Sequence, residues 1–158
     1  MALQPAVKEL LDQINAAKEA GAPAIQEMTV QENRQGLLEF YKDLRGEVQE
    51  VGRVEDVKIP VEGDEITLRI YTPKGNGPFP VIMFFHGGGW VLGDIEIVDP
   101  ICRSLTNSTE CMVVSVDYRL APEHKFPTGI EDCYAATKWV AENIQKHNGD
   151  PQKIITCG

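Results

Sequence analysis

The sequence predicts an α/β protein whose mostly parallel sheet has an antiparallel start and follows a helical segment. Apolar and polar residues alternate on both sides of the turn 62–64, which is typical of an antiparallel hairpin. Two later runs, 80–85 and 111–116, are almost continuously apolar, as in parallel strands covered on both faces. Segments with helical periodicity follow each of these runs. Strands and helices therefore alternate along the chain, as in a doubly wound sheet.

Residues 1–46 are predicted to form two amphipathic helices. Their apolar residues recur at helical spacing and are Leu3, Val7, Leu10, Leu11 and Ile14 in the first helix, and Leu37, Leu38, Tyr41 and Leu44 in the second. Thr29 and Glu32 form a capping box before the second helix, and Gly46 is expected to end it. The apolar face of this segment needs a partner, which is either the body of the domain or a bound ligand.

The sheet and its helices are expected in residues 47–158. One helix is predicted to begin with Asp99 as its cap and Pro100 at its first position. Another is predicted to begin at a capping box of Thr128 and Glu131 and to end at Asn148-Gly149. Its predicted buried face consists of Ile130, Cys133, Tyr134, Thr137, Val140 and Ile144. The run 153–157 is predicted to be the last strand.

Three consecutive glycines follow the strand predicted at 80–85, within the run His86-Gly87-Gly88-Gly89-Trp90. Because glycine has no Cβ, the backbone can turn sharply there and come close to a ligand. Backbone N–H groups presented by such a loop stabilise an oxyanion. The sequence therefore predicts acyl-transfer chemistry at the carboxyl end of this strand.

The nucleophile of such chemistry is missing from the 158 residues. No G-x-S-x-G motif occurs, and Ser104, Ser108 and Ser115 lack the flanking glycines of a nucleophile elbow. Gly158 follows the last predicted strand, where a hydrolase begins the turn to its nucleophile. We therefore expect the chain to be the first half of an enzyme, truncated before the elbow, whose missing C-terminal half can be a separate chain.

Composition excludes several other functions. The hydrophobic content of 42% and charged content of 25% are ordinary for one soluble globular domain. A net charge of -9 argues against nucleic acid and against an anionic membrane surface as partners. The N-terminus has no secretion signal, and no apolar run is long enough to span a membrane, so a cytoplasmic location is expected. The four cysteines, Cys102, Cys111, Cys133 and Cys157, are expected to be free core thiols, and neither a metal nor another cofactor is expected.

Two further motifs accompany the glycine run, namely Gly93-Asp94 and the segment DYRLAPEHKFP from Asp117 to Pro127. With these motifs the chain resembles the hormone-sensitive-lipase family of α/β-hydrolase carboxylesterases over its whole length. The resemblance implies the N-terminal half of an α/β-hydrolase fold. It also implies that residues 1–46 are a helical cap segment and that residues 47–158 are the first half of the hydrolase core.

The resemblance implies roles for the glycine run and its surroundings. Gly88 and Gly89 would donate backbone N–H groups to the oxyanion, and Gly87 would give the loop its turn. The remaining residues would support the loop: the ring of His86 would hold its shape rather than act as a base, with Trp90, Arg119 and Glu123 as further supports. Gly158 would match the first glycine of the family's G-D-S-A-G elbow. His147 is expected at a helix C-terminus, in a surface or capping role.

The resulting expectation is a serine esterase that hydrolyses small esters with short to medium acyl chains, without a cofactor, and whose oligomeric state is open. Two alternatives remain. A relative of this fold can use the covered pocket as a non-catalytic receptor site, and the chain can be an inactive truncated fragment. A dinucleotide site fails on spacing, because Leu92 stands where G-x-G-x-x-G requires its third glycine.

Overall fold

The computed structural model describes residues 3–44 and 46–158, so residues 1, 2 and 45 of the predicted cap segment lie outside the described residues. The chain divides into two compact units, Met1–Asn33 and Arg34–Gly158. Helix α1 (Pro5–Glu19) and the 3-10 turn η1 (Ile25–Glu27) belong to the first unit, and α2 (Val30–Leu44) begins there and continues into the second. Two predicted helices are thereby confirmed. A domain boundary at residue 46 stays a prediction.

The capping box before α2 is confirmed by its hydrogen bonds. The Glu32 N–H donates to Thr29 Oγ1 at 3.2 Å, and the Thr29 N–H donates to Glu32 Oε2 at 2.7 Å. Both ends of the box therefore satisfy N–H groups that the first helical turn leaves without partners.

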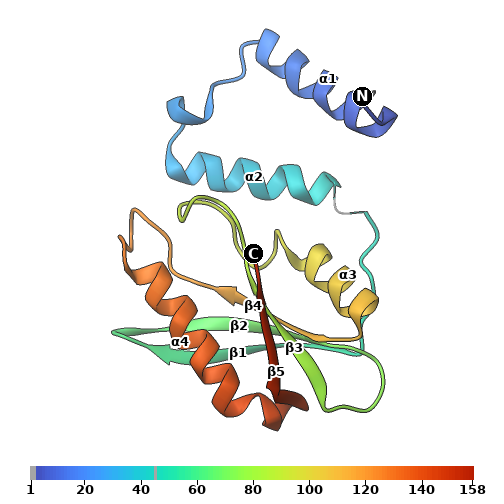
Figure 1. Cartoon of the computed structure of the whole chain (residues 1–158). Helices are drawn as coiled ribbons and strands as arrows, with labels where there is room; N and C mark the ends of the chain where they lie inside the picture. The colour runs from blue at the N-terminus through green and yellow to red at the C-terminus, as the bar shows by residue number, and fades with distance from the viewer. Residues whose placement is uncertain (1–2, 45) are drawn as a thin grey trace. The chain divides into compact units, whose positions relative to one another are not determined.

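A five-stranded sheet is the centre of the second unit (Figure 1). Its spatial order is β1 (Arg53–Val61), β2 (Asp64–Thr72), β4 (Met112–Asp117), β3 (Phe79–Phe85) and β5 (Gly149–Cys157). Strands β1, β2 and β4 pair antiparallel, whereas β3 pairs parallel with β4 and with β5. The predicted α/β class and the antiparallel start are confirmed. The last strand begins at Gly149 instead of 153, because Gly149 already pairs with Phe79.

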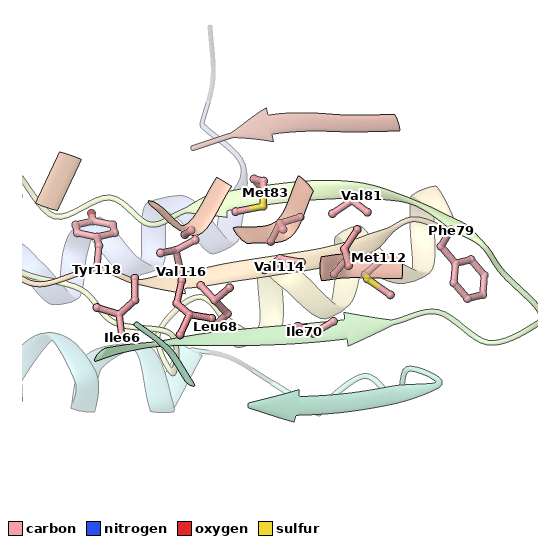
Figure 2. Close-up of a cluster of buried hydrophobic side chains, with 14 residues drawn as sticks. Ile66, Leu68, Ile70, Phe79, Val81, Met83, Met112, Val114, Val116 and Tyr118 are labelled. Carbon is pink, nitrogen blue, oxygen red and sulfur yellow. The ribbon is translucent and has the colours of Figure 1, made fainter. Parts of the chain in front are cut away.

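Helices cover both faces of this sheet, which explains the continuously apolar sequences of β3 and β4. On one face, α4 (Thr128–Asn143) and the 3-10 turn η2 (Ile144–His147) pack on the side chains that Figure 2 shows along β2, β3 and β4. On the other face, α3 (Asp99–Thr109) and the second-unit part of α2 pack on a separate apolar cluster. Among the described residues, no helix combines the length and apolar character needed to cross a membrane.

Two predicted helix caps are wrong. Asp99 is the first residue of α3 instead of its cap, and its carboxylate accepts hydrogen bonds from the Tyr71 hydroxyl at 2.9 Å and from Arg103 Nε at 2.7 Å. Helix α4 has Pro127 at its cap position, and no side chain caps it. The Asp99 carboxylate is thus satisfied by Tyr71 of β2 and by Arg103 one turn along α3, and the capping-box spacing of Thr128 and Glu131 forms no box.

The predicted buried face of α4 is also wrong in part. The buried positions of the helix are Gly129, Asp132, Ala136 and Val140, while Ile130 and Tyr134 are 49% and 74% exposed. The apolar pattern missed this face because its second member is a carboxylate. Asp132 is buried through an ion pair with Arg119, which the pattern of apolar residues does not register.

All four cysteines are free, as predicted, but they are not all core residues. Cys102 is buried on α3, where burial raises its pKa to about 12. Cys157 is exposed because it lies on β5, at the edge of the described sheet. The prediction of a core thiol is therefore wrong for Cys157.

Candidate functional site

The glycine loop leaves the sheet at the carboxyl end of β3, directly after Phe85. Gly88 and Gly89 have φ values of 134° and 62°, a region of backbone conformation that favours glycine. The Gly88 carbonyl accepts hydrogen bonds from the N–H groups of Val91 at 3.2 Å and Leu92 at 2.9 Å, which closes a tight turn. A Cβ on Gly88 would lie 1.9 Å from the Leu92 carbonyl oxygen, so only glycine fits there.

The loop presents its main chain to solvent. Gly87, Gly88 and Gly89 are exposed. Within the described part of the chain, the N–H groups of Gly88 and Gly89 donate to no acceptor. Two adjacent, unpaired amides in a turn of this kind can bind a negatively charged oxygen.

His86 is buried beneath the loop, 4% exposed. Its Nδ1 lies 2.9 Å from the Gly87 carbonyl oxygen, which assigns the proton to Nδ1 as the donor. The ring stacks on Tyr118 with centroids 4.2 Å apart, and the Tyr118 hydroxyl donates to the His86 carbonyl oxygen at 2.5 Å. Burial raises the pKa of Tyr118 to about 12, so the hydroxyl keeps its proton. Gly93 closes this cluster, since a Cβ there would lie 2.5 Å from His86 Nδ1.

Arg34 of α2 holds the far side of the loop, and sequence reasoning did not single it out. Its Nε donates to the Val91 carbonyl at 2.8 Å and its Nη2 to the Ala121 carbonyl at 2.9 Å. The guanidinium also binds both carboxylate oxygens of Glu123, at 2.8 and 2.9 Å. The Arg34 hydrogen bond lowers the pKa of Glu123 to about 2. In the sequence alone, an arginine on a helix is most simply interpreted as a solvated charge. The contacts of Arg34 are therefore found only in the tertiary structure.

The other predicted supporting residues have distinct surroundings. Arg119 Nε and Nη2 bind Asp132 at 2.9 and 2.7 Å, and its Nη1 donates to the Glu62 carbonyl at 3.2 Å, so none of these bonds reaches the glycine loop. The Trp90 carbonyl accepts from the Ala121 N–H at 2.8 Å. The Trp90 side chain is 59% exposed and borders an apolar hollow, lined also by His124, Phe126 and Ile130.

Among the described residues, no serine hydroxyl is hydrogen-bonded to a histidine that could activate it as a nucleophile. Ser115 is buried in β4. His147 lies in the 3-10 turn after α4, with Nδ1 2.9 Å from Glu55 Oε1. In residues 3–44 and 46–158, no cluster of three His, Cys, Asp or Glu side chains could hold a metal ion.

Gly158 lies beside the start of the loop. A Cβ at this position would be 2.8 Å from the Phe85 carbonyl oxygen. Because β3 and β5 run parallel, their carboxyl ends meet at the same edge of the sheet, and Figure 1 shows the loop and the end of β5 there. A segment that follows this position in a hydrolase fold would therefore begin beside Phe85, where the glycine loop starts.

Comparisons with known proteins agree with this architecture. Residues 82–158 match the model of a family with the alpha/beta hydrolase fold. The arylesterase of Saccharolobus solfataricus is 49% identical over 108 residues, which are 68% of this chain and 35% of that protein. Carboxylesterase NlhH of Mycobacterium tuberculosis is 43% identical over 108 residues, 67% of this chain and 34% of that protein.

Solved structures match nearly the whole chain. The hyperthermophilic esterase of Pyrobaculum calidifontis has 39% identity and a TM-score of 0.86, covering 99% of this chain and 48% of that one. An ester-hydrolase from the metagenome of Lake Arreo has 34% identity and a TM-score of 0.91, and the match covers 98% of this chain and 50% of that one. The chain thus spans about half the length of these structures.

The mixed sheet, with a glycine loop after β3, defines an α/β-hydrolase fold. The chain belongs to the hormone-sensitive-lipase family of these hydrolases, of which it spans the N-terminal half.

Proposed function

We propose that this chain supplies the oxyanion-hole half of a serine carboxylesterase that acts on esters with short to medium acyl chains. The observation that carries the proposal is the glycine loop, in which positive φ values at Gly88 and Gly89 leave two exposed amides unpaired. Relatives described as an arylesterase and as a carboxylesterase support the same reaction class.

The chemistry follows from where charge develops. A serine attacks the ester carbonyl, and a histidine takes the serine proton and later donates it to the leaving alcohol. The carbonyl oxygen becomes an oxyanion in the tetrahedral intermediate, and the N–H groups of Gly88 and Gly89 donate to it. These donors stabilise the transition state more than the bound ester, so they accelerate turnover.

The chain's own supporting residues keep the loop in this conformation. The Nδ1–H of His86 donates to the Gly87 carbonyl, which fixes the start of the loop. Trp90 accepts from Ala121 at the end of the loop. Glu123 acts through Arg34, whereas Arg119 acts on the opposite end of the 117–127 segment through Asp132.

The catalytic serine, aspartate and histidine would come from the second half of the fold, in the same protein or as a separate chain. The position of Gly158 against Phe85 supports this assignment, because a nucleophile elbow that begins there would lie next to the two glycine amides. The small-molecule ester is then bound between the two halves. The cytoplasmic location stays a prediction.

The experiment compares residues 1–158 alone with the assembled enzyme, meaning this chain together with the second half of the fold. The assembled enzyme should hydrolyse p-nitrophenyl butyrate and be inactivated stoichiometrically by a serine-directed phosphonate. The chain alone should show neither property, because it has no activated nucleophile. Turnover by the chain alone, or inertness of the folded assembled enzyme toward ester and phosphonate, would contradict the proposal.

A further inference from the structure

Arg34 joins three segments that are far apart in the sequence. It projects from α2, its Nε donates to the carbonyl of Val91 at the end of the glycine turn, and its Nη2 donates to the carbonyl of Ala121. Its Nη1 and Nη2 groups also donate to the two carboxylate oxygens of Glu123. The Arg34 side chain is 24% exposed, and its two bonds to main-chain carbonyls are partly buried, whereas the bonds to Glu123 are exposed. A single planar group thus fixes two main-chain carbonyls and one carboxylate at once.

The glycine loop needs such a fixed end. Three consecutive glycines have more backbone freedom than any other tripeptide, so the direction of their N–H groups is set by what holds the two ends of the loop. His86 and Tyr118 hold the first end from beneath. At the second end, Val91 donates its N–H to Gly88 and offers its carbonyl to Arg34. The carbonyl that Arg34 binds belongs to the same peptide group as the Leu92 N–H, which donates to Gly88 and helps to close the turn.

We propose that Arg34 is a positioning residue for the oxyanion hole. The proposal rests on the proposed esterase function of the glycine loop. Arg34 sets the orientation of the Gly88 and Gly89 amides through Val91 and Ala121, and it does not contact the ester itself. Because oxyanion donors act only when they point at the developing charge, a small rotation of these amides lowers turnover without weakening substrate binding to the same degree.

A purely structural ion pair would behave differently. Lysine in place of Arg34 can keep the charge pair with Glu123, but a single ammonium cannot span the Val91 and Ala121 carbonyls and the carboxylate in one plane. If only the charge pair matters, Arg34→Lys behaves like the wild type. If the carbonyl contacts position the loop, Arg34→Lys loses turnover although the charge remains.

Arg103 provides the matched control. It also lies on a helix, binds one carboxylate, Asp99, at 2.7 Å, and donates to one main-chain carbonyl, that of Gln49, at 3.1 Å. It is 18% exposed and has no hydrogen bond to the glycine loop. Arg103→Lys therefore removes a comparable clamp at a distance from the proposed oxyanion hole.

The experiment measures kcat and KM for p-nitrophenyl butyrate in the assembled enzyme with Arg34→Lys, Arg34→Met or Arg103→Lys. We expect kcat to fall roughly tenfold in Arg34→Lys and further in Arg34→Met, the effect of a small misplacement of reacting groups, with KM changed by less than about threefold. Arg103→Lys should leave both constants near their wild-type values. If Arg34→Met does not fold, Arg34→Lys decides the question.

Equal kcat values in Arg34→Lys and Arg103→Lys, in an active enzyme whose Gly89→Val variant loses turnover, would overturn the positioning role and leave the proposed function intact. Wild-type inactivity, or full turnover in Gly89→Val, would instead overturn the proposed function and with it the role of Arg34. A fall in kcat restricted to the Arg34 variants supports the proposal.

Discussion

Neighbouring glycines in the loop are required for different physical reasons. Gly88 has no room for a Cβ, because the Leu92 carbonyl oxygen would lie 1.9 Å away. Gly89 has open space around it, but its φ of 62° is costly for residues with a side chain. Packing and a φ of 134° together thus require glycine at position 88, whereas backbone conformation alone requires it at position 89. Both constraints serve one conformation, in which the amides stay unpaired and exposed.

Asp117, the last residue of β4, is predicted to make stability depend on pH. Burial raises its pKa above the ordinary value of 3.8, with Asp94 adding to the effect, so the folded state holds this proton more tightly than the unfolded state does. Its contribution to stability is therefore largest below about pH 3.8 and declines as the pH rises through the raised pKa. Asp117→Asn should accordingly raise the free energy of unfolding at pH 7 but not at pH 3.5, as measured by urea unfolding.

Asp56 provides a control, because its pKa is shifted in the opposite direction to that of Asp117. A hydrogen bond from Arg69 lowers the pKa of Asp56, so its ionised form stabilises the fold above about pH 3.8. Asp56→Asn should then lower stability at pH 7. The same sign of change for both variants at pH 7 would contradict the assignment of the Asp117 shift to burial.

At the scale of elements, α4 is attached to the sheet by a buried ion pair as well as by apolar packing. The Asp132 carboxylate is 1% exposed and accepts three hydrogen bonds from Arg119, including one from its main-chain N–H at 3.0 Å. This contact connects the segment after β4 to the second turn of α4. It also explains why a charged residue lies on the helix face that meets the core.

Asp132→Ala should therefore destabilise the fold strongly, because it leaves the Arg119 guanidinium without its partner. Removing one member of a buried pair costs about 3–5 kcal/mol. The matched change Asp12→Ala, in the exposed pair with Lys8 on α1, should cost less than about 1 kcal/mol. Chemical denaturation measures both values, and equal effects would show that burial does not strengthen the Asp132 contact.

Sequence patterns predicted the elements better than their contacts. The antiparallel hairpin, both buried strands and the glycine loop follow from local periodicity and from glycine chemistry, which the sequence displays directly. The buried face of α4, the contact of Asp99 with Tyr71 and the contacts of Arg34 depend on residues far away in the chain. Arg34 and Glu123 are 89 positions apart, and no local pattern relates them. The missed contacts are thus the ones made by charged side chains between elements.

At the scale of the whole molecule, the boundary between the two compact units lies between Asn33 and Arg34, inside the predicted cap segment 1–46. The predicted cap can therefore be deleted in two steps. Deleting residues 1–33 removes the first unit but keeps Arg34, Leu37 and Leu38, the last two of which pack against the sheet. Deleting residues 1–46 removes these contacts as well. The two deletions therefore separate a ligand-covering role from a packing role.

We predict that deletion of residues 1–33 from the assembled enzyme changes the relative kcat/KM values for acetyl, butyryl and octanoyl esters with little loss of stability. Deletion of residues 1–46 should in addition lower the melting temperature, because the packing of the partly buried Leu37 and Leu38 is lost, and each contributes less than the roughly 1.5–3 kcal/mol of a fully buried side chain. Unchanged chain-length preference in both deletions would leave the segment with a packing role only.

The most direct test of the oxyanion assignment is kcat in the assembled enzyme with Gly88→Val or Gly89→Val, compared with Gly63→Val. Gly63, in the β1–β2 turn, has a φ of 75° and open space around it, so it reproduces the backbone strain of Gly89 away from the loop. We predict a fall in kcat on the order of 10²–10³ in both loop variants, the effect of losing one oxyanion donor, with a much smaller change in KM. Gly63→Val should retain kcat. Folded Gly88→Val and Gly89→Val enzymes that keep kcat within about threefold of wild type, far less than a lost donor costs, would contradict the oxyanion assignment.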